Sequence, residues 1–275
     1  MNTRRPLSLS FAAVWLASFV ASSPVAAQTS RASRPSQASK AVLEQVKTLE
    51  AAIKDRKFAR EKEAIDHIDE LLGRYDSLHE KSQRKFVGAL KNVYRAKKRK
   101  PTNAAIYVAT AAALGEVGGS DGFKVLKGAW NNKAFSKRKE WASLQDQLLE
   151  AIGKTGDKNA LVLLLDEASD AHEDGIKLAA GRALRHFSEH TFKQRKLIVK
   201  ELIQAFTNIE NGARDNLNQD PTVETRKRTL RAIADPWNQT LAEMTGESFR
   251  TAAEWRSWWN DYKNKPKKWK HQTGS

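Results

Sequence analysis

The chain has 275 residues, no cysteine and a formal net charge of +16, because 48 Lys and Arg residues outnumber 32 Asp and Glu residues. A hydrophobic content of 40% is enough to bury the core of one or two domains. The lack of cysteine excludes a disulfide framework, a lipid-carrying cysteine and a thiol nucleophile. The positive charge favours polyanionic partners and carries no information on the fold.

Residues 1–27 have the pattern of a secretory signal peptide. Two arginines precede an apolar run over residues 9–20, and the small residues up to Ala27 suit a cleavage site. A membrane anchor is the alternative, but the run is shorter than the roughly 20 apolar residues that cross a bilayer. We therefore expect export to the periplasm or the extracellular space, with cleavage near Ala27 and no membrane span afterwards. Residues 28–40, rich in Ser, Arg and Gln, are expected to form a flexible lead-in.

From residue 41 onward, apolar residues recur every three or four positions, and no alternating run of β-branched residues predicts a strand. The expected fold class is therefore all-α, with a helical domain over residues 41–264 and a basic tail over residues 265–275. Prolines and glycines between the apolar runs mark the helix ends, and Pro236 is expected to separate two helices. Ser120 and Asp157 are expected to cap helix starts, and Thr251 with Glu254 matches a capping box. The expected helices cover residues 41–54, 58–73, 78–97, 103–117, 121–133, 138–153, 158–169, 174–189, 192–209, 222–234, 237–245 and 252–264.

Basic residues are densest between residues 81 and 100, which hold nine Lys and Arg and no acidic residue. The helix in this segment is expected to bury Phe86, Leu90, Val93 and Tyr94. Its other faces would then be strongly positive, as in proteins that bind phosphate or sulfate groups, and a merely solvated surface is the alternative. The candidate binding residues here are Arg84, Lys85, Lys91, Arg95, Lys97, Lys98, Arg99 and Lys100.

An internal repeat relates residues 113–126 to residues 151–164 at a constant offset of 38 residues. Each copy ends one helix in small and aliphatic residues, turns through glycine, and opens a second helix with apolar residues. The Ala-x-x-Leu-Gly-x-x-Gly-Asp pattern, with Asp157 at the turn of the second copy, resembles the HEAT-repeat family. That resemblance implies an α-solenoid of antiparallel helix pairs, in which each pair buries its apolar face against its neighbours.

Residues 186–190 match the His-x-x-Glu-His zinc signature of inverted zinc metallopeptidases, in which two histidines bind zinc and the glutamate is the general base. A capping box from Thr191 to Gln194 starts a new helix directly afterwards, so the two imidazoles are not expected to share a helical face. Zinc hydrolysis through His186, Glu189 and His190 is therefore a remote enzymatic alternative. We expect no cofactor, no resident metal and no catalysis.

The C-terminal region combines a Thr-Gly pair, a phenylalanine and a Trp-x-x-Trp-Trp run, which resembles the ending of many secreted bacterial HEAT-repeat proteins. That resemblance implies a scaffold or interaction role. Four of the aromatic residues fall on one helical face, which fits either a packed cap on the last helix pair or an exposed binding platform. The packed cap is the preferred interpretation, because large aromatic residues at helical spacing usually pack. Neighbouring lysines add weight to the platform, because cations and aromatic rings together suit nucleic acid or sugar ligands. These further candidate residues are Trp255, Trp258, Trp259, Tyr262, Lys267, Lys268 and Trp269.

The leading functional hypothesis is an exported, non-catalytic HEAT-like scaffold that binds an unidentified protein partner. It depends on the repeat and on the aromatic C-terminal motif. The alternative is a polyanion-binding module, for nucleic acid or acidic polysaccharide, that uses residues 81–100 and the C-terminus. Salt dependence distinguishes the two hypotheses, since release of counterions makes polyanion binding weaken steeply as salt rises.

Overall fold

The computed structural model describes residues 39–96, 99–101, 104–135, 139–214 and 222–269. These residues form α-helices and short 3-10 helices without a strand, which confirms the all-α class. The expected signal peptide and the lead-in up to residue 38 lie outside the described residues. The first helix begins at Lys40, so the last residue of the expected lead-in is already helical. Within the described part of the chain, no helix is both long and apolar enough to span a bilayer.

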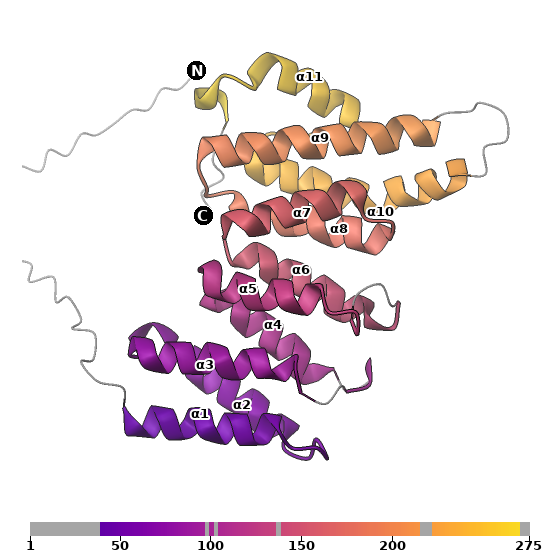
Figure 1. Ribbon diagram of the computed structural model, residues 1–275. Helices are drawn as coiled ribbons and strands as arrows, with labels where there is room; N and C mark the ends of the chain where they lie inside the picture. The colour runs from indigo at the N-terminus through magenta and orange to yellow at the C-terminus, as the bar shows by residue number, and fades with distance from the viewer. Residues whose placement is uncertain (1–38, 97–98, 102–103, 136–138, 215–221, 270–275) are drawn as a thin grey trace, which may run out of the picture. The chain divides into compact units, whose positions relative to one another are not determined.

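The helices follow one another with short connections, and most boundaries agree with the sequence pattern to within a few residues (Figure 1). They are α1 (Lys40–Ile53), α2 (Glu61–Leu72), α3 (Glu80–Val93), α4 (Ala105–Val117), α5 (Gly119–Trp130), α6 (Ala142–Lys154), α7 (Lys158–Asp170), α8 (Asp174–Ala183), α9 (Phe192–Arg214), α10 (Thr222–Thr245) and α11 (Ala252–Tyr262).

Side-chain caps fix the starts of α7, α9 and α11, as the sequence predicts. The Asp157 side chain accepts a hydrogen bond from the backbone N–H of Asn159 at 2.7 Å. Thr191 and Gln194 make the expected reciprocal pair, with N···O distances of 3.3 and 3.4 Å. Thr251 forms the same capping box at the start of α11. Each cap satisfies N–H groups that have no partner within the helix.

Pro236 does not separate two helices, so the expected break there is wrong. α10 continues through this proline, and the Pro236 carbonyl accepts a hydrogen bond from the Thr240 hydroxyl at 3.1 Å. Proline has no N–H, so the helix loses a backbone hydrogen bond at a cost of roughly 3 kcal/mol. Ile233, Trp237 and Leu241 are completely buried around this point. Their burial contributes about 1.5–3 kcal/mol each, which outweighs the loss.

The end of α8 also differs from the prediction, because the chain turns into a 3-10 helix, η4 (Leu184–Phe187), instead of continuing to residue 189. Leu184 and Phe187 are both completely buried. Side chains three residues apart lie one above the other in a 3-10 helix, so this geometry brings both into the core. α9, in contrast, extends beyond its predicted end and reaches Arg214.

Helices that alternate along the chain pack side by side. α2, α4, α6, α8 and α10 each contact the next in that order, as do α1, α3 and α5, and then α7, α9 and α11. Figure 1 shows the odd-numbered helices from α1 to α9 in chain order. α5 and α7 are the exception, because their backbones barely approach each other. The apolar core lies between neighbouring helices.

The two copies of the repeat adopt matching turns, one between α4 and α5 and one between α6 and α7. Gly118 (φ 70°) and Gly156 (φ 63°) both have the left-handed backbone conformation that glycine tolerates best. The backbone N–H of Gly119 donates to the Thr155 carbonyl at 2.8 Å, so the two turns are directly joined. Ser120 lies inside α5, and the expectation that it caps this helix is wrong.

Candidate binding surfaces

The expected basic surface lies on α3 and directly after it. The predicted core stripe is buried, namely Phe86, Leu90, Val93 and Tyr94. Five candidate cations are exposed, namely Arg84, Lys85, Lys91, Arg95 and Lys100. Lys97 and Lys98 lie outside the described residues. This part of the chain therefore presents a positive surface made by the remaining faces of one helix and the segment that follows it.

Arg99 does not belong to this surface, and its prediction as an exposed binding residue is wrong. Its side chain is 0% exposed. Its Nε donates to the Glu61 carboxylate at 2.6 Å, and its guanidinium carbon lies 4.5 Å from the ring centroid of Phe58. A flat guanidinium can stack on a ring and pair with a carboxylate at the same time. Arg99 therefore fastens the segment after α3 to the start of α2.

The C-terminal aromatic residues form a packed cluster and not an open platform. Trp255, Trp258 and Trp269 are 0%, 6% and 4% exposed, and Trp259 and Tyr262 are half-buried. The ring centroids of Trp258 and Trp269 are 5.3 Å apart. A ring must offer a free face to stack on a ligand. The platform interpretation is therefore wrong for the three buried tryptophans, and the packed cap is the arrangement that the structure has.

Trp269 anchors the beginning of the predicted basic tail. Its ring packs against Phe192 of α9 with the centroids 4.9 Å apart, and its indole N–H donates to the Tyr262 carbonyl at 3.0 Å. The 3-10 helix η5 (Pro266–Lys268) directly precedes it and leaves Lys267 and Lys268 exposed. Residues 270–275 lie outside the described residues. The two lysines are thus held on a folded segment beside α9.

The His-x-x-Glu-His segment does not assemble a metal site in the part of the chain that the structure describes. His186 lies in η4, and its Nε2 is 2.7 Å from the Glu150 carboxylate in α6. The His190 ring packs against Phe187 instead, with the centroids 4.8 Å apart. Among the described residues, no group of three or more His, Asp or Glu side chains is placed to hold a metal ion.

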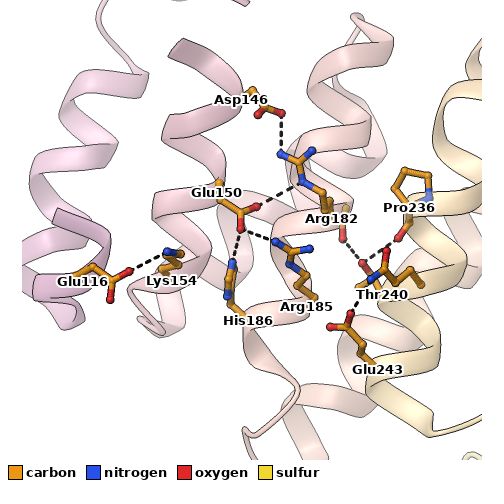
Figure 2. Close-up of polar contacts among 12 residues, drawn as sticks. Glu116, Asp146, Glu150, Lys154, Arg182, Arg185, His186, Pro236, Thr240 and Glu243 are labelled. Carbon is orange, nitrogen blue, oxygen red and sulfur yellow. Dashed lines mark hydrogen bonds and ion pairs between the residues drawn. The ribbon is translucent and has the colours of Figure 1, made fainter. Parts of the chain in front are cut away.

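A polar network that sequence reasoning missed joins α6 to α8 and η4 (Figure 2). Glu150 accepts a hydrogen bond from Arg185 at 2.8 Å, contacts His186 at 2.7 Å, and lies 3.5 Å from Arg182 Nε. Arg182 also donates to Asp146 at 2.8 Å. Burial acts to raise the pKa of Glu150, but the hydrogen bonds and charges of His186 and Arg185 together lower this pKa to about 2. Glu150 therefore stays ionised over the whole neutral range.

A similar charged link joins α4 to α6, the preceding pair of even-numbered helices. Lys154 donates to Glu116 at 2.8 Å, across a sequence separation of 38 residues, and both side chains are exposed. Glu150 lies 35 and 36 residues before its partners Arg185 and His186. A search for opposite charges at the 38-residue repeat spacing would have found the Glu116–Lys154 link, but the Glu150 links are two and three residues shorter and would need a wider search. Because these side chains satisfy one another, we interpret them as connections between successive helices and not as a ligand site.

A groove of about 540 Å³, here called the α7–α9 groove, lies between those two helices. It contains Val162 and Leu197, which are 54% and 40% exposed and are the two most exposed large hydrophobic side chains of the described residues. Its charged lining residues are Asp166, Asp170 and Glu201, with no Lys or Arg. Exposed apolar side chains that share one groove are typical of binding surfaces.

A second groove, of about 860 Å³, lies where α5 and α7 barely approach each other, and is here called the α5–α7 groove. The Trp130 indole N–H donates to Glu167 at 2.8 Å within it. Asp166 and Asp170 line this groove as well as the first one. Its lining includes four carboxylates, and Lys133 is the only Lys or Arg. Both grooves are therefore acidic, in a chain that is strongly basic as a whole.

Comparison of this chain with protein-family models, with curated proteins and with solved structures gives no match in any of the three searches. The functional assignment therefore depends on the surfaces described above.

Proposed function

We propose that this chain is an exported, non-catalytic scaffold, built as an α-solenoid of HEAT-like helix pairs, that binds a protein partner. Three observations support the solenoid: the 38-residue repeat, the matching glycine turns, and the contacts between helices that alternate along the chain. Export is inferred from the signal-peptide pattern of residues 1–27.

The observation that carries the binding role is the α7–α9 groove, where Val162 and Leu197 are exposed together. Complete burial of a fully exposed Val or Leu side chain contributes about 1.5–3 kcal/mol. Because Val162 and Leu197 are already about half-buried, a partner that covers them gains roughly half of that from each, before the entropy cost of association. The groove offers apolar area beside carboxylates, which suits recognition of another protein.

Site-specific crosslinking in the producing cells tests this role. A photo-reactive amino acid placed at Val162 or Leu197 is expected to give one discrete protein adduct in the envelope or secreted fraction. The same amino acid at Lys47, an exposed position on α1, is the matched control and is expected to give no such adduct. If both groove positions give no adduct beyond that of the control, the proposal is overturned.

Polyanion binding is the second candidate function, favoured by the exposed cations of α3 and by the lack of acidic residues over residues 81–100. The burial of Arg99 decides how to test it, because reversing that charge would disrupt folding and not only binding. We propose a double reversal at Lys85 and Lys91, compared with one at Lys124 and Lys158, which are exposed on α5 and α7.

Heparin is the probe, titrated over a series of salt concentrations. If α3 binds polyanions, the Lys85→Glu/Lys91→Glu protein should lose affinity and show a shallower salt slope, by about one unit per lost contact. The Lys124→Glu/Lys158→Glu protein has the same net charge and should keep both the heparin affinity and the salt slope of the unsubstituted protein. Equal losses in the two proteins would mean that heparin responds to net charge alone, and the α3 assignment would fall.

A further inference from the structure

The geometry points to a basic amphipathic segment of another protein as the partner that docks on α7, in the two grooves that flank this helix. This inference rests on the scaffold proposed above and names the chemistry of its partner. Residues 162–174 hold five acidic residues and no Lys or Arg, in a chain with a net charge of +16. Folding places this segment between the α7–α9 groove and the α5–α7 groove.

Two of the three carboxylates on the C-terminal half of α7, Asp166 and Asp170, are not used to hold the fold together, whereas Glu167 accepts a hydrogen bond from Trp130. Among the described residues, Asp166 and Asp170 make no hydrogen bond or ion pair, in contrast to Glu116 and Glu150. Lys177 is near enough to Asp170 to interact with its charge, so Asp166 is the less compensated of the two carboxylates. Asp166 and Asp170 are both exposed and lie one helical turn apart. Like charges at this spacing destabilise a helix by about 0.2–0.5 kcal/mol. A cationic partner would remove that repulsion.

An apolar group and two acidic groups follow one another at one-turn spacing along the same exposed part of α7. Val162 precedes Asp166 by one turn, and Leu197 faces them from α9 across the groove. A partner helix with leucines and lysines one turn apart would present both kinds of group in register. The α5–α7 groove, with Glu167 and Trp130 in its lining, gives a long cationic side chain room beside carboxylates. Charge complementarity therefore selects a basic segment over an acidic or purely apolar one.

A defined peptide tests the partner's chemistry without knowledge of the natural partner. The probe is a fluorescent amphipathic peptide of Leu and Lys, about four helical turns long, and its control is a peptide of the same composition with the order shuffled. Fluorescence anisotropy with the whole protein after signal removal is expected to show binding of the amphipathic peptide, and weaker binding of the shuffled one. Equal affinity for the two peptides would overturn the inference.

Matched variants then place the peptide on α7. Asp166→Asn/Asp170→Asn, and separately Val162→Ser, which removes the apolar group without adding charge, are each expected to raise the Kd by at least about tenfold. The control is Asp66→Asn/Asp69→Asn, which removes two exposed carboxylates from α2 and makes the same change in net charge. An equal rise of the Kd in both double variants would show non-specific attraction and overturn the docking site.

Two further outcomes separate this inference from the scaffold that it rests on. If crosslinking at Val162 gives its adduct in cells while the Leu and Lys peptide does not bind, the scaffold stands and the basic partner falls. If the protein alone sediments as a dimer that the Asp166→Asn/Asp170→Asn substitutions dissociate, the occupant is a second copy of this chain, and the inference of a different partner is overturned.

Discussion

At the scale of single residues, Glu150 shows how a charged group can stabilise this fold from within. Its side chain is 15% exposed and lies among Arg182, Arg185 and His186. Taking a carboxylate out of water is costly unless cations and hydrogen-bond donors surround it. Arg182 of α8, with Arg185 and His186 of η4, supplies those cations and hydrogen-bond donors.

We expect Glu150→Gln to lower the free energy of unfolding by about 2–3 kcal/mol, since the two arginines would lose the charge that they share. Urea unfolding followed by circular dichroism measures this loss. Glu116→Gln is the control, because the Glu116–Lys154 pair is exposed. Exposed pairs contribute about 0–1 kcal/mol. A similar loss for the two substitutions would contradict the special role given to Glu150.

The lowered pKa of Glu150 also predicts how stability depends on pH. A carboxyl with a folded pKa of about 2, against a usual value of 4.5, binds protons more weakly in the folded state than in the unfolded state. Its contribution, on the order of 3 kcal/mol, is present above pH 4.5 and is lost as the pH falls from there towards 2. The unfolding free energy of the Glu150→Gln protein should fall less over this range. Parallel curves for the two proteins would show that other groups cause the acid sensitivity.

The buried pair of Arg99 and Glu61 leads to a third prediction at this scale. Removing the carboxylate leaves the guanidinium buried without its counter-charge, so Glu61→Gln should destabilise the fold by about 3–5 kcal/mol. Arg99→Met keeps most of the side-chain volume against Phe58 and should cost less. Thermal or urea unfolding of both variants measures the difference. A negligible effect of Glu61→Gln would mean that Arg99 is solvated after all, as the sequence alone had suggested.

At the scale of helices, close contact between α8 and α10 depends on a residue without a side chain. A Cβ atom added to Gly181 would lie 2.0 Å from Nε1 of Trp237, which is completely buried. We therefore expect Gly181→Ala to destabilise the protein by about 1–3 kcal/mol through overpacking. Gly128→Ala is the control, because a Cβ atom there meets nothing within 4 Å and alanine favours a helix by about 1 kcal/mol. The melting temperature should fall for the first variant and rise for the second.

The sequence predicts the helices of this protein well because their apolar spacing is local information. Asp157, Thr191 and Thr251 fix helix starts through hydrogen bonds within three residues, and these were predicted correctly. Pro236 was mispredicted, because the burial that keeps α10 continuous comes from contacts with other helices. Local signals therefore locate a helix more reliably than they locate its interruption.

Candidate binding residues were harder to predict, because exposure depends on partners far away in the sequence. The charge run over residues 81–100 could not show that Arg99 turns inward to Glu61, which lies 38 residues earlier. The spacing correctly placed Trp255 and Trp258 on one helical face, but the burial of that face depends on Trp269 and α9, which the spacing could not reveal. The α7–α9 groove joins segments that only folding brings together, although the acidic run of residues 162–174 was visible in the sequence.

At the scale of the whole molecule, each helix packs mainly against helices that are close to it in the chain. Stability in such an arrangement is approximately a sum of local terms, so damage at one end need not spread to the other. The C-terminal cluster is a suitable place to test this, because α11 packs chiefly on α9. α11 contributes the buried Trp255 and Trp258, and the buried Trp269 directly follows η5.

Truncation after Gly246 removes α11, η5 and Trp269, and it uncovers the side of α9 that carries Phe192. Burial of even one large aromatic side chain contributes about 1.5–3 kcal/mol, so amide hydrogens of α9 should exchange at least roughly tenfold faster. Amides of α1 to α4 should keep their protection, because α11 is not among the helices that they pack against. Hydrogen exchange followed by mass spectrometry resolves the two regions. Faster exchange throughout the chain would instead mean that the helices unfold as one cooperative unit, and the local account of stability would be wrong.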